Sequence, residues 1–252
     1  MDVLILAGSD KDSELTQHEN VENKAFIKLK DKYIISYIIE AMQRTEAVER
    51  IAVVAPPSAL GILNKSYHII PIVQKGALLA NVQEGFKVLA PKGLFLVTTG
   101  DIPLITPEAV NDFLEKSRAV ESDFYYPVVE RKSCEAAYPG VERTFVRLKE
   151  GYFTGGNLFF VNAPVVEQLL SRVEVFFKYR KNPLKLAFLF GWLTIIKYFI
   201  GQLSVADLEK RFSVLFGIRA KAIVSNFAAI ATDIDKLSDL ELVRLIMARE
   251  QN

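Results

Sequence analysis

Short apolar runs alternate with stretches of helical periodicity along the first two thirds of the chain. Apolar runs rich in β-branched residues predict strands at 3–6, 50–55, 68–73, 93–99, 124–129, 144–148 and 157–161. Apolar residues at helical spacing predict helices at 34–42 and 78–88. Another helix is expected to begin at Thr106, because Pro107 and Glu108 follow it. Strands that alternate with helices predict a three-layer α/β/α fold with a mostly parallel, twisted sheet.

The pattern changes between 165 and 216, where consecutive helices without strands are expected. We interpret this stretch as a helical insertion. A β-branched run at 222–225 and an amphipathic helix at 238–248 then close the chain. The polar stretch 9–23 is expected to be a loop, because it is too polar for a core. No repeat or linker interrupts the sequence, so residues 1–252 are expected to form a single domain.

The apolar character of the window 184–200, the most apolar of the chain, can be explained in several ways. Its length of about 17 residues is at the short limit for a spanning helix, and Lys185 and Lys197 interrupt it. Helices packed on the domain's own core are the commonest explanation for such a window. Its aromatic content and its flanking lysines and arginines also suit an interfacial amphipathic helix, with peripheral membrane contact, or the contact of a homodimer.

Composition narrows the classes of partner. The chain is 50% hydrophobic, which is enough for one large core, and its formal net charge is +1. This balance gives no case for nucleic acid, or for an anionic surface, as the general partner. Cys134 is the one cysteine, so the chain has no intramolecular disulfide and no zinc cluster built on cysteine, which fits the cytoplasm. The opening run has no basic leader, so we expect a buried strand there and not a signal peptide.

Acidic residues follow two of the predicted strands. Asp101 lies just past the strand at 93–99, and Asp233 and Asp235 lie near the last one. Ligands of open α/β sheets bind at the carboxyl ends of the strands, so these acids and the turn at Gly8 are expected to converge. Two carboxylates from separate strands can hold a Mg²⁺ that also binds a triphosphate. We treat the two-residue spacing of Asp233 and Asp235 as placing them on opposite faces.

Six short segments, in order, resemble the MobA-like nucleotidyltransferases, which belong to the nucleotide-diphospho-sugar transferase superfamily of GT-A type fold. They are Leu6-Ala7-Gly8, Asn23-Lys24-Ala25-Phe26-Ile27, 33–41, Gly100-Asp101-Ile102-Pro103-Leu104, 154–159 and 233–241. The resemblance spans nearly the whole chain. It implies transfer of a nucleoside monophosphate from an NTP, with GTP or CTP favoured, to a small phosphorylated acceptor. It also implies release of pyrophosphate and a requirement for Mg²⁺.

The resemblance assigns roles residue by residue. It assigns nucleotide binding to Leu6, Ala7, Gly8, Lys24, Gln74, Gly76 and Asn81. Within that set Lys24 would neutralise phosphate, and Gln74, Gly76 and Asn81 would contact the base. The acceptor or its phosphate would be held by Gly155, Gly156 and Asn157. Asp101 matches one metal-binding position, and Asp235 or its neighbour Asp233 matches the second.

Each of these residues also has an ordinary structural explanation. Asp101 could cap a helix or close a turn, and Asp233 or Asp235 could cap the final helix. Lys24 could be a solvated surface lysine, and Gly155-Gly156 could be only a turn between strands. His18 and His68 have no partners at readable spacing.

The loop Ser9–Glu14 departs from the family pattern, because it lacks the usual extra glycine and arginine. Glycine allows close approach of the backbone to phosphate, whereas Asp10 and Asp12 would repel it. Either Lys11 or Lys24 would have to compensate. A non-catalytic nucleotide-binding relative is therefore one alternative. The other is a glycosyltransferase that uses a nucleotide sugar, since Asp233-Ile234-Asp235 has Asp-x-Asp spacing, although such motifs typically follow a central strand.

Overall fold

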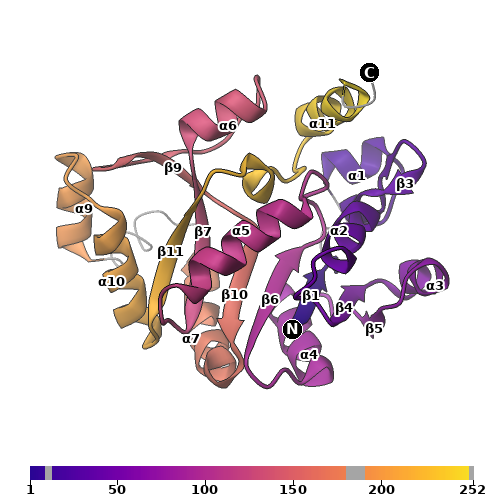
Figure 1. The fold of residues 1–252 in the computed structure, drawn as a ribbon, viewed down its shortest axis with the longest axis horizontal. Coiled ribbons are helices and arrows are strands. Elements are labelled where there is room, and N and C mark those ends of the chain that lie inside the picture. The colour runs from indigo at the N-terminus through magenta and orange to yellow at the C-terminus, as the bar shows by residue number, and fades with distance from the viewer. Residues whose placement is uncertain (9–12, 180–190, 250–252) are drawn as a thin grey trace.

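The computed structural model describes residues 1–8, 13–179 and 191–249 (Figure 1). The described residues form a nine-stranded sheet with helices on both sides, as predicted. Eight of its strands follow the order β5-β4-β1-β6-β10-β7-β9-β8, and β11 pairs with β7. The loop residues 9–12 and the window residues 184–190 lie outside the described residues.

The strands of this sheet are β1 Asp2–Leu6, β4 Arg50–Ala55, β5 Ile70–Val73, β6 Leu94–Thr99, β7 Phe124–Glu130, β8 Val146–Leu148, β9 Gly151–Gly155, β10 Leu158–Asn162 and β11 Ala220–Ser225. The half formed by β5, β4, β1 and β6 is parallel throughout. In the other half β10 runs antiparallel to β6 and β7, and β11 runs parallel to β7. A small hairpin joins β2 Lys28–Leu29 to β3 Lys32–Tyr33.

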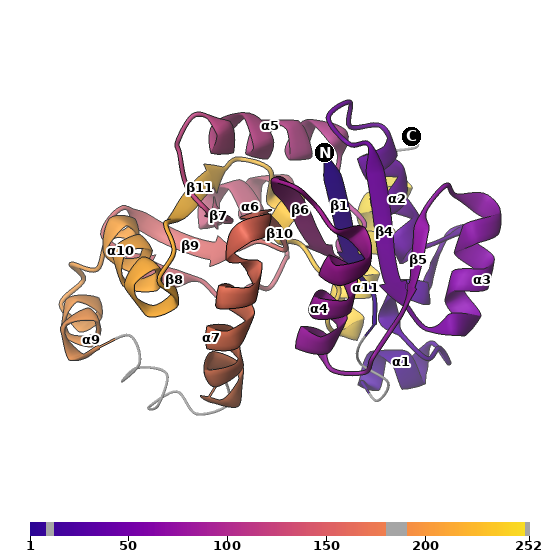
Figure 2. The ribbon, with the colours of Figure 1, turned by 90° about the horizontal axis from the view of Figure 1, so that it is seen from below.

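Alternation along β1 shows why helices cover both faces. Val3 and Ile5 belong to the larger core cluster, whereas Leu4 between them belongs to the cluster on the opposite face. A strand of period two that is apolar on both faces must be covered on both. The first face carries α2 Ile34–Gln43, α3 Pro57–Ser66, α5 Pro107–Arg118 and α11 Leu237–Arg249. The second carries α4 Leu78–Leu89 and α7 Val166–Tyr179, which Figure 2 shows from below.

Most of the predicted elements are present within a few residues of their expected bounds. Helix α5 begins as its sequence indicates, because the side chain of Thr106 accepts from the amide of Ala109 and Pro107 opens the helix. The pattern missed β9, the β2–β3 hairpin, α3 and α6 Arg131–Ala137. The prediction of one loop at 9–23 was wrong at 14–18. Ser13 caps α1 Glu14–His18, whose Leu15 and Thr16 are buried.

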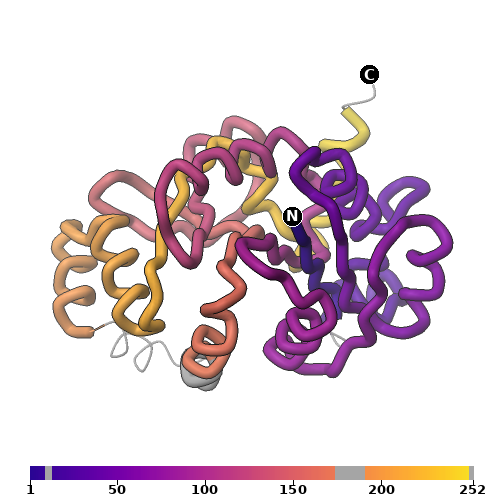
Figure 3. The backbone as a smooth tube through the Cα atoms, turned by 60° about the horizontal axis from the view of Figure 1, so that its bottom comes forward, coloured from indigo at the N-terminus to yellow at the C-terminus, as the bar shows by residue number. Residues whose placement is uncertain are grey.

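The described part of 165–216 consists of helices, as predicted. These are α7, α9 Trp192–Phe199 and α10 Val205–Phe216, and Figure 3 shows α9 and α10 together at one end of the molecule. The expectation that the apolar window packs into the core is wrong for the residues of α9. Trp192 and Phe199 are 65% and 81% exposed. Among the described residues, no helix is long and apolar enough to cross a bilayer.

Candidate functional site

Three carboxylates from distant parts of the chain meet beyond the end of β6. Asp101 lies in the turn that follows this strand, and Asp233 and Asp235 lie between the short helix η3 Ala228–Ala231 and α11. One carboxylate oxygen from each lies within 4.8 Å of the others. The amide of Ile234 donates to the carbonyl of Asp101 at 3.0 Å, which joins the two segments. The predicted convergence of these acids at a strand end is therefore present.

The expectation that Asp233 and Asp235 point to opposite faces is wrong, because both reach Asp101. Side chains two residues apart in an extended chain point to the same side, so the spacing itself places Asp233 and Asp235 together and Ile234 on the other side. Ile234 between them is fully buried in the main core and anchors the segment. This anchor leaves both flanking carboxylates beside Asp101.

Neither acid acts as the cap of α11. That role falls to Asp239, whose Oδ2 accepts from the amides of Asp235 and Lys236 at 3.0 and 3.1 Å. Asp101 does not cap α5 either, because Thr106 does so. The carboxylates of Asp101, Asp233 and Asp235 therefore do not serve as helix caps.

Lys24 lies against this cluster rather than in solvent. Its Nζ is 2.7 Å from Oδ2 of Asp101 and also pairs with Asp235, and its side chain is 14% exposed. The neighbouring Asn23 fixes this position. Its Oδ1 accepts from the amide of Ala25 at 2.9 Å, and its Nδ2 donates to the carbonyl of Ala7 at 2.8 Å. The end of β1 and the segment that carries Lys24 are thus held together by one buried amide side chain.

Arg143 is a member of the site that the sequence pattern did not reveal. It comes from the loop between α6 and β8, pairs with the carboxylate of Asp233, and donates to its carbonyl at 2.9 Å. The loop has no periodicity, and 90 positions separate the two residues. No local signal indicates such a pair, because only the three-dimensional fold brings these loops together.

Burial and charge act on the pKa values in opposite directions. Burial raises the pKa of Asp233 to about 6, helped by the nearby charges of Asp101 and Asp235, although Arg143 opposes the shift. Burial also raises the pKa of Asp235, but the hydrogen bond and charge of Lys24 outweigh it and leave that pKa lowered. Burial lowers the pKa of Lys24, and the charges of Asp101 and Asp235 more than reverse this. The acids thus hold Lys24 as an ammonium ion.

The cluster has the chemistry of a divalent cation site. Its three carboxylates face two cationic side chains, so one negative charge remains when all three are ionised. Oδ1 of Asp101 is buried and has no hydrogen-bond partner among the described residues. A buried carboxylate oxygen without a partner is costly in a folded protein. A donor set of carboxylate oxygens fits a hard cation such as Mg²⁺.

The residues assigned to the nucleotide gather where β1 ends. The amide of Ala7 donates to the carbonyl of Val54 at 2.8 Å, which extends the strand pairing to the turn. A Cβ on Gly8 would lie 2.8 Å from Nδ2 of Asn81 and 2.9 Å from Cβ of Gln74. Glycine is therefore required here by close packing. Gly76 lies in the exposed turn that follows Gln74 and has a φ of 91°.

Asn81 bonds to the backbone of two segments, which is a structural role separate from the base contact expected of it. Its Nδ2 donates to the carbonyl of Gly8 at 2.7 Å, and its Oδ1 accepts from the amide of Lys75 at 2.6 Å. Both ends of the side-chain amide are thus engaged by the backbone, and the residue is buried. Asn81 holds the turn after β1 against the segment after β5.

The residues assigned to the acceptor form the break between β9 and β10. The amide of Gly156 donates to Pro127 at 2.9 Å, and the amide of Asn157 donates to Ile230 at 2.9 Å. A Cβ on Gly156 would lie 2.6 Å from Cγ2 of Ile230, so the close approach of these segments requires glycine. The carbonyl of Asn157 accepts from Oγ1 of Thr98 at 3.0 Å, which places the break beside the end of β6.

Comparisons with known proteins show what the chain as a whole resembles. The chain is 31% identical to a hypothetical transferase structure from Thermus thermophilus, with a TM-score of 0.84 over 95% of this chain and 98% of that one. A CMP:2-keto-3-deoxy-manno-octonic acid synthetase complexed with CTP is 15% identical, with a TM-score of 0.60 over 99% of each chain. A 4-diphosphocytidyl-2C-methyl-D-erythritol synthase from Anaerococcus prevotii is 13% identical, with a TM-score of 0.59 over 100% of this chain and 96% of that one. The last two likenesses show the fold alone.

None of the curated proteins matches the chain significantly. The model of the MobA-like NTP transferase domain, by contrast, matches residues 3–177. That range holds the turn after β1, Lys24, Asp101 and the Gly155–Asn157 break, while Asp233 and Asp235 lie beyond it. The match covers well over half of the chain, and the resemblance seen in its short motifs is confirmed: the protein belongs to the MobA-like NTP transferase family.

Proposed function

We propose that the protein transfers a nucleoside monophosphate from an NTP to a phosphorylated acceptor, with Mg²⁺ as cofactor and pyrophosphate as the second product. The observation that carries the proposal is the meeting of Asp101, Asp233 and Asp235 with Lys24 at the carboxyl end of the parallel strands. Ligands of α/β sheets bind at this end. Membership of the NTP transferase family gives the reaction class.

In the proposed reaction an oxygen of the acceptor phosphate attacks the α-phosphorus of the NTP. A new phosphoanhydride bond forms as the bond between the α- and β-phosphates breaks, and pyrophosphate leaves. Mg²⁺ held by Asp101, Asp233 and Asp235 would offset charge on the phosphate oxygens. Catalysis of this kind rests on positioning and electrostatics, so no nucleophile from the protein is required.

Lys24 has two tasks in this proposal. Its ammonium bridges Asp101 and Asp235, which keeps the carboxylates close together despite their charge. A cation bound by the same oxygens would compete with that ammonium, and Lys24 would then be available to neutralise phosphate. A lysine suits both tasks because it is a point charge on a flexible stem.

The remaining residues are proposed to position the two substrates. Leu6, Ala7 and Gly8 would lie against the nucleotide, with Gln74 and Gly76 beside its base and Asn81 holding the turn. Gly155, Gly156 and Asn157 would hold the acceptor, because the break that they form lies beside the end of β6. GTP and CTP remain the favoured nucleotides, and CTP is the ligand named for one of the structural neighbours.

The test is pyrophosphate release by the full chain with each of the four common NTPs, Mg²⁺ and a panel of phosphorylated small molecules. We expect release with at least one pair, dependence on Mg²⁺, and loss in Asp101→Ala with the fold retained. Turnover of a nucleotide sugar without pyrophosphate release would favour a glycosyltransferase instead. NTP binding without turnover across the panel would favour a non-catalytic relative. Wild-type turnover in Asp101→Ala would contradict the proposed site.

A further inference from the structure

Helix α9 presents an apolar face to solvent. Its most exposed side chains, apart from Lys197, are apolar and lie at i, i+1, i+4, i+7 and i+8, which is one face of a helix: Trp192, Leu193, Ile196, Phe199 and Ile200. We call these five residues the α9 face. Their exposed fractions run from 46% to 81%. A surface helix of a globular protein normally carries polar residues on its outer side.

The side of α9 that is turned toward the protein is also apolar in part, since Ile195 and Thr194 are half-buried. These half-buried residues already make the contact of α9 with the protein, so the outer apolar residues are not needed for that contact. A contiguous exposed apolar patch on a protein surface marks an interaction site. The question is what covers the α9 face.

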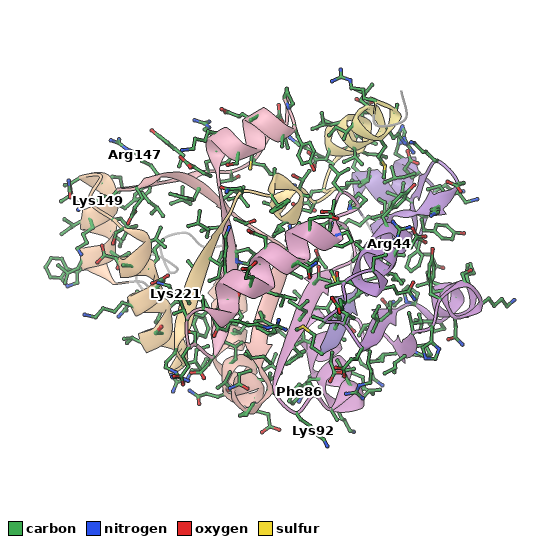
Figure 4. All side chains as sticks on the ribbon, viewed as in Figure 1. Arg44, Phe86, Lys92, Arg147, Lys149 and Lys221 are labelled. Atoms are coloured by element: carbon green, nitrogen blue, oxygen red, sulfur yellow. The ribbon has the colours of Figure 1, made fainter. Side chains whose placement is uncertain are left out.

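Basic residues surround this face. Lys197 lies on α9 itself, and a Cβ on Gly201, just past the helix, would lie 3.5 Å from the guanidinium of Arg147. The amide of Lys149 donates to the carbonyl of Leu203 at 2.7 Å, which brings the β8–β9 turn to the same end of α9. Figure 4 shows Arg147 and Lys149 at the end of the molecule that carries α9.

The acids of this region have partners within the protein, and the pair that Asp207 makes neutralises Lys197. Asp207 pairs with Lys197 at 2.5 Å and accepts from Ser204, and Glu209 pairs with Lys221 at 3.0 Å. Glu150 accepts from the amide of Val205 at 3.2 Å. Arg147 and Lys149 are exposed and make no ion pair among the described residues, so they leave positive charge beside the α9 face.

We propose that the α9 face docks on an anionic membrane surface. Aromatic and aliphatic side chains would enter the boundary between headgroups and acyl chains, and the surrounding lysines and arginines would meet the lipid phosphates. This combination of an apolar face, aromatic residues and basic flanks is what interfacial helices use. The binding is peripheral and does not require the helix to cross the bilayer.

A second copy of the chain fits the α9 face less well. A two-fold interface places each patch against the same patch of the other subunit. Two patches that each carry Arg147 and Lys149 would then face one another, and like charges across an interface disfavour it. An anionic surface satisfies the apolar face and its basic surroundings together.

Trp192 makes the proposal directly testable, because it is the single tryptophan of the chain and lies on the α9 face. The full-length protein is mixed with vesicles of phosphatidylcholine alone or with 30% phosphatidylglycerol. We expect flotation with the anionic vesicles and a blue shift of Trp192 emission. Brominated lipids should quench that emission, and raised salt should weaken the binding.

The double variant Phe199→Ser/Ile200→Ser keeps Trp192 and removes part of the face. We expect its partition onto vesicles to fall about tenfold or more. The matched control is Val224→Ser/Leu245→Ser, which removes exposed apolar side chains elsewhere and should bind as the wild type does. Far-UV circular dichroism verifies the fold of each variant.

Three results would overturn the proposal. One is that the wild type stays at the bottom of the gradient and Trp192 emission does not move. Another is that the two double variants float equally well. The third is that Trp192 emission shifts with protein concentration alone, together with a dimer mass in solution, which would assign the α9 face to a second copy.

Discussion

The ammonium of Lys24 lies 2.7 Å from Oδ2 of Asp101, although Lys24 belongs to the short helix Lys24–Phe26 and Asp101 to the turn after β6. The two strands are parallel neighbours in the sheet, so their carboxyl ends deliver both residues to the same place. Asn23, tied to the carbonyl of Ala7, keeps Lys24 at that end. The contact therefore follows from the register of β1 and β6 and from one buried side-chain amide.

Replacement of Lys24 by methionine tests its place between the carboxylates. Without the ammonium, Asp101, Asp233 and Asp235 repel one another, so we expect the free energy of unfolding in EDTA to fall by up to about 3 kcal/mol. The same loss of a competing positive charge should strengthen binding of a divalent cation alone, while turnover with NTP falls. Thermal melts with and without Mg²⁺ measure the first two effects. Weaker cation binding in Lys24→Met would contradict this role.

Replacement of Arg143 by methionine tests whether it positions Asp233. Its guanidinium holds both the carboxylate and the carbonyl of that residue. We expect a loss of about tenfold or more in cation affinity, the size seen when residues behind metal ligands are removed. The matched control is Arg131→Met, whose side chain pairs with Glu135 on the surface of α6 and should leave the affinity unchanged. Equal affinities in the two variants would show that Arg143 has no such role.

Gly156→Ala tests the strand break between β9 and β10. The added Cβ would lie 2.6 Å from Cγ2 of Ile230 and 2.9 Å from Cγ of Pro127, so the packed segments would have to move apart. We expect a loss of about 2 kcal/mol in the free energy of unfolding. Gly93→Ala is the control, because nothing lies within 4 Å of its added Cβ. Urea denaturation measures the free energy of unfolding of both variants. Equal losses of this free energy in Gly156→Ala and Gly93→Ala would contradict the packing argument.

Asp207 should make the stability of the protein depend on pH. The hydrogen bond from Lys197 and the bonds from Ser204 hold the pKa of Asp207 at about 2, below its ordinary 3.8. Because the folded pKa is depressed, the contribution of this carboxylate is present above about pH 4 and is lost as the pH falls toward 2. We expect Asp207→Asn to cost about 1 kcal/mol at pH 7 and much less below pH 2. An equal cost at both values would assign the loss to the capping bonds instead of the charge.

The sequence predicted the layers of the fold because each of its central strands is a short apolar run with turn residues after it. It also predicted where the chemistry should lie, since Asp101 follows the strand with the clearest pattern. The β9 strand was missed because Gly151 and Gly155 leave little β-branched character between them. The helix at Glu14 was missed because a polar stretch hides the two buried residues of a single short turn.

The parts of the site that escaped prediction depend on tertiary contacts. Arg143 lies in an irregular loop, and only the fold brings it to Asp233. The expectation that Asp233 and Asp235 point to opposite sides misapplied the period of an extended chain, in which residues two apart share a side. Ile234 between them points the other way and is buried in the core. The exposure of α9 could not be predicted either, because an apolar helix looks the same in sequence whether it is buried or faces solvent.

The central claim is that Asp101, Asp233 and Asp235 hold a divalent cation together with an NTP, and electron paramagnetic resonance of Mn²⁺ tests it most directly. Mn²⁺ is titrated into the full chain with CTP or GTP, and the free-ion signal is followed, with each nucleotide alone as the blank. The account predicts Mn²⁺ bound by the wild type beyond that blank and about a hundredfold weaker binding in Asp101→Asn. Equal titrations for the wild type and Asp101→Asn would contradict it.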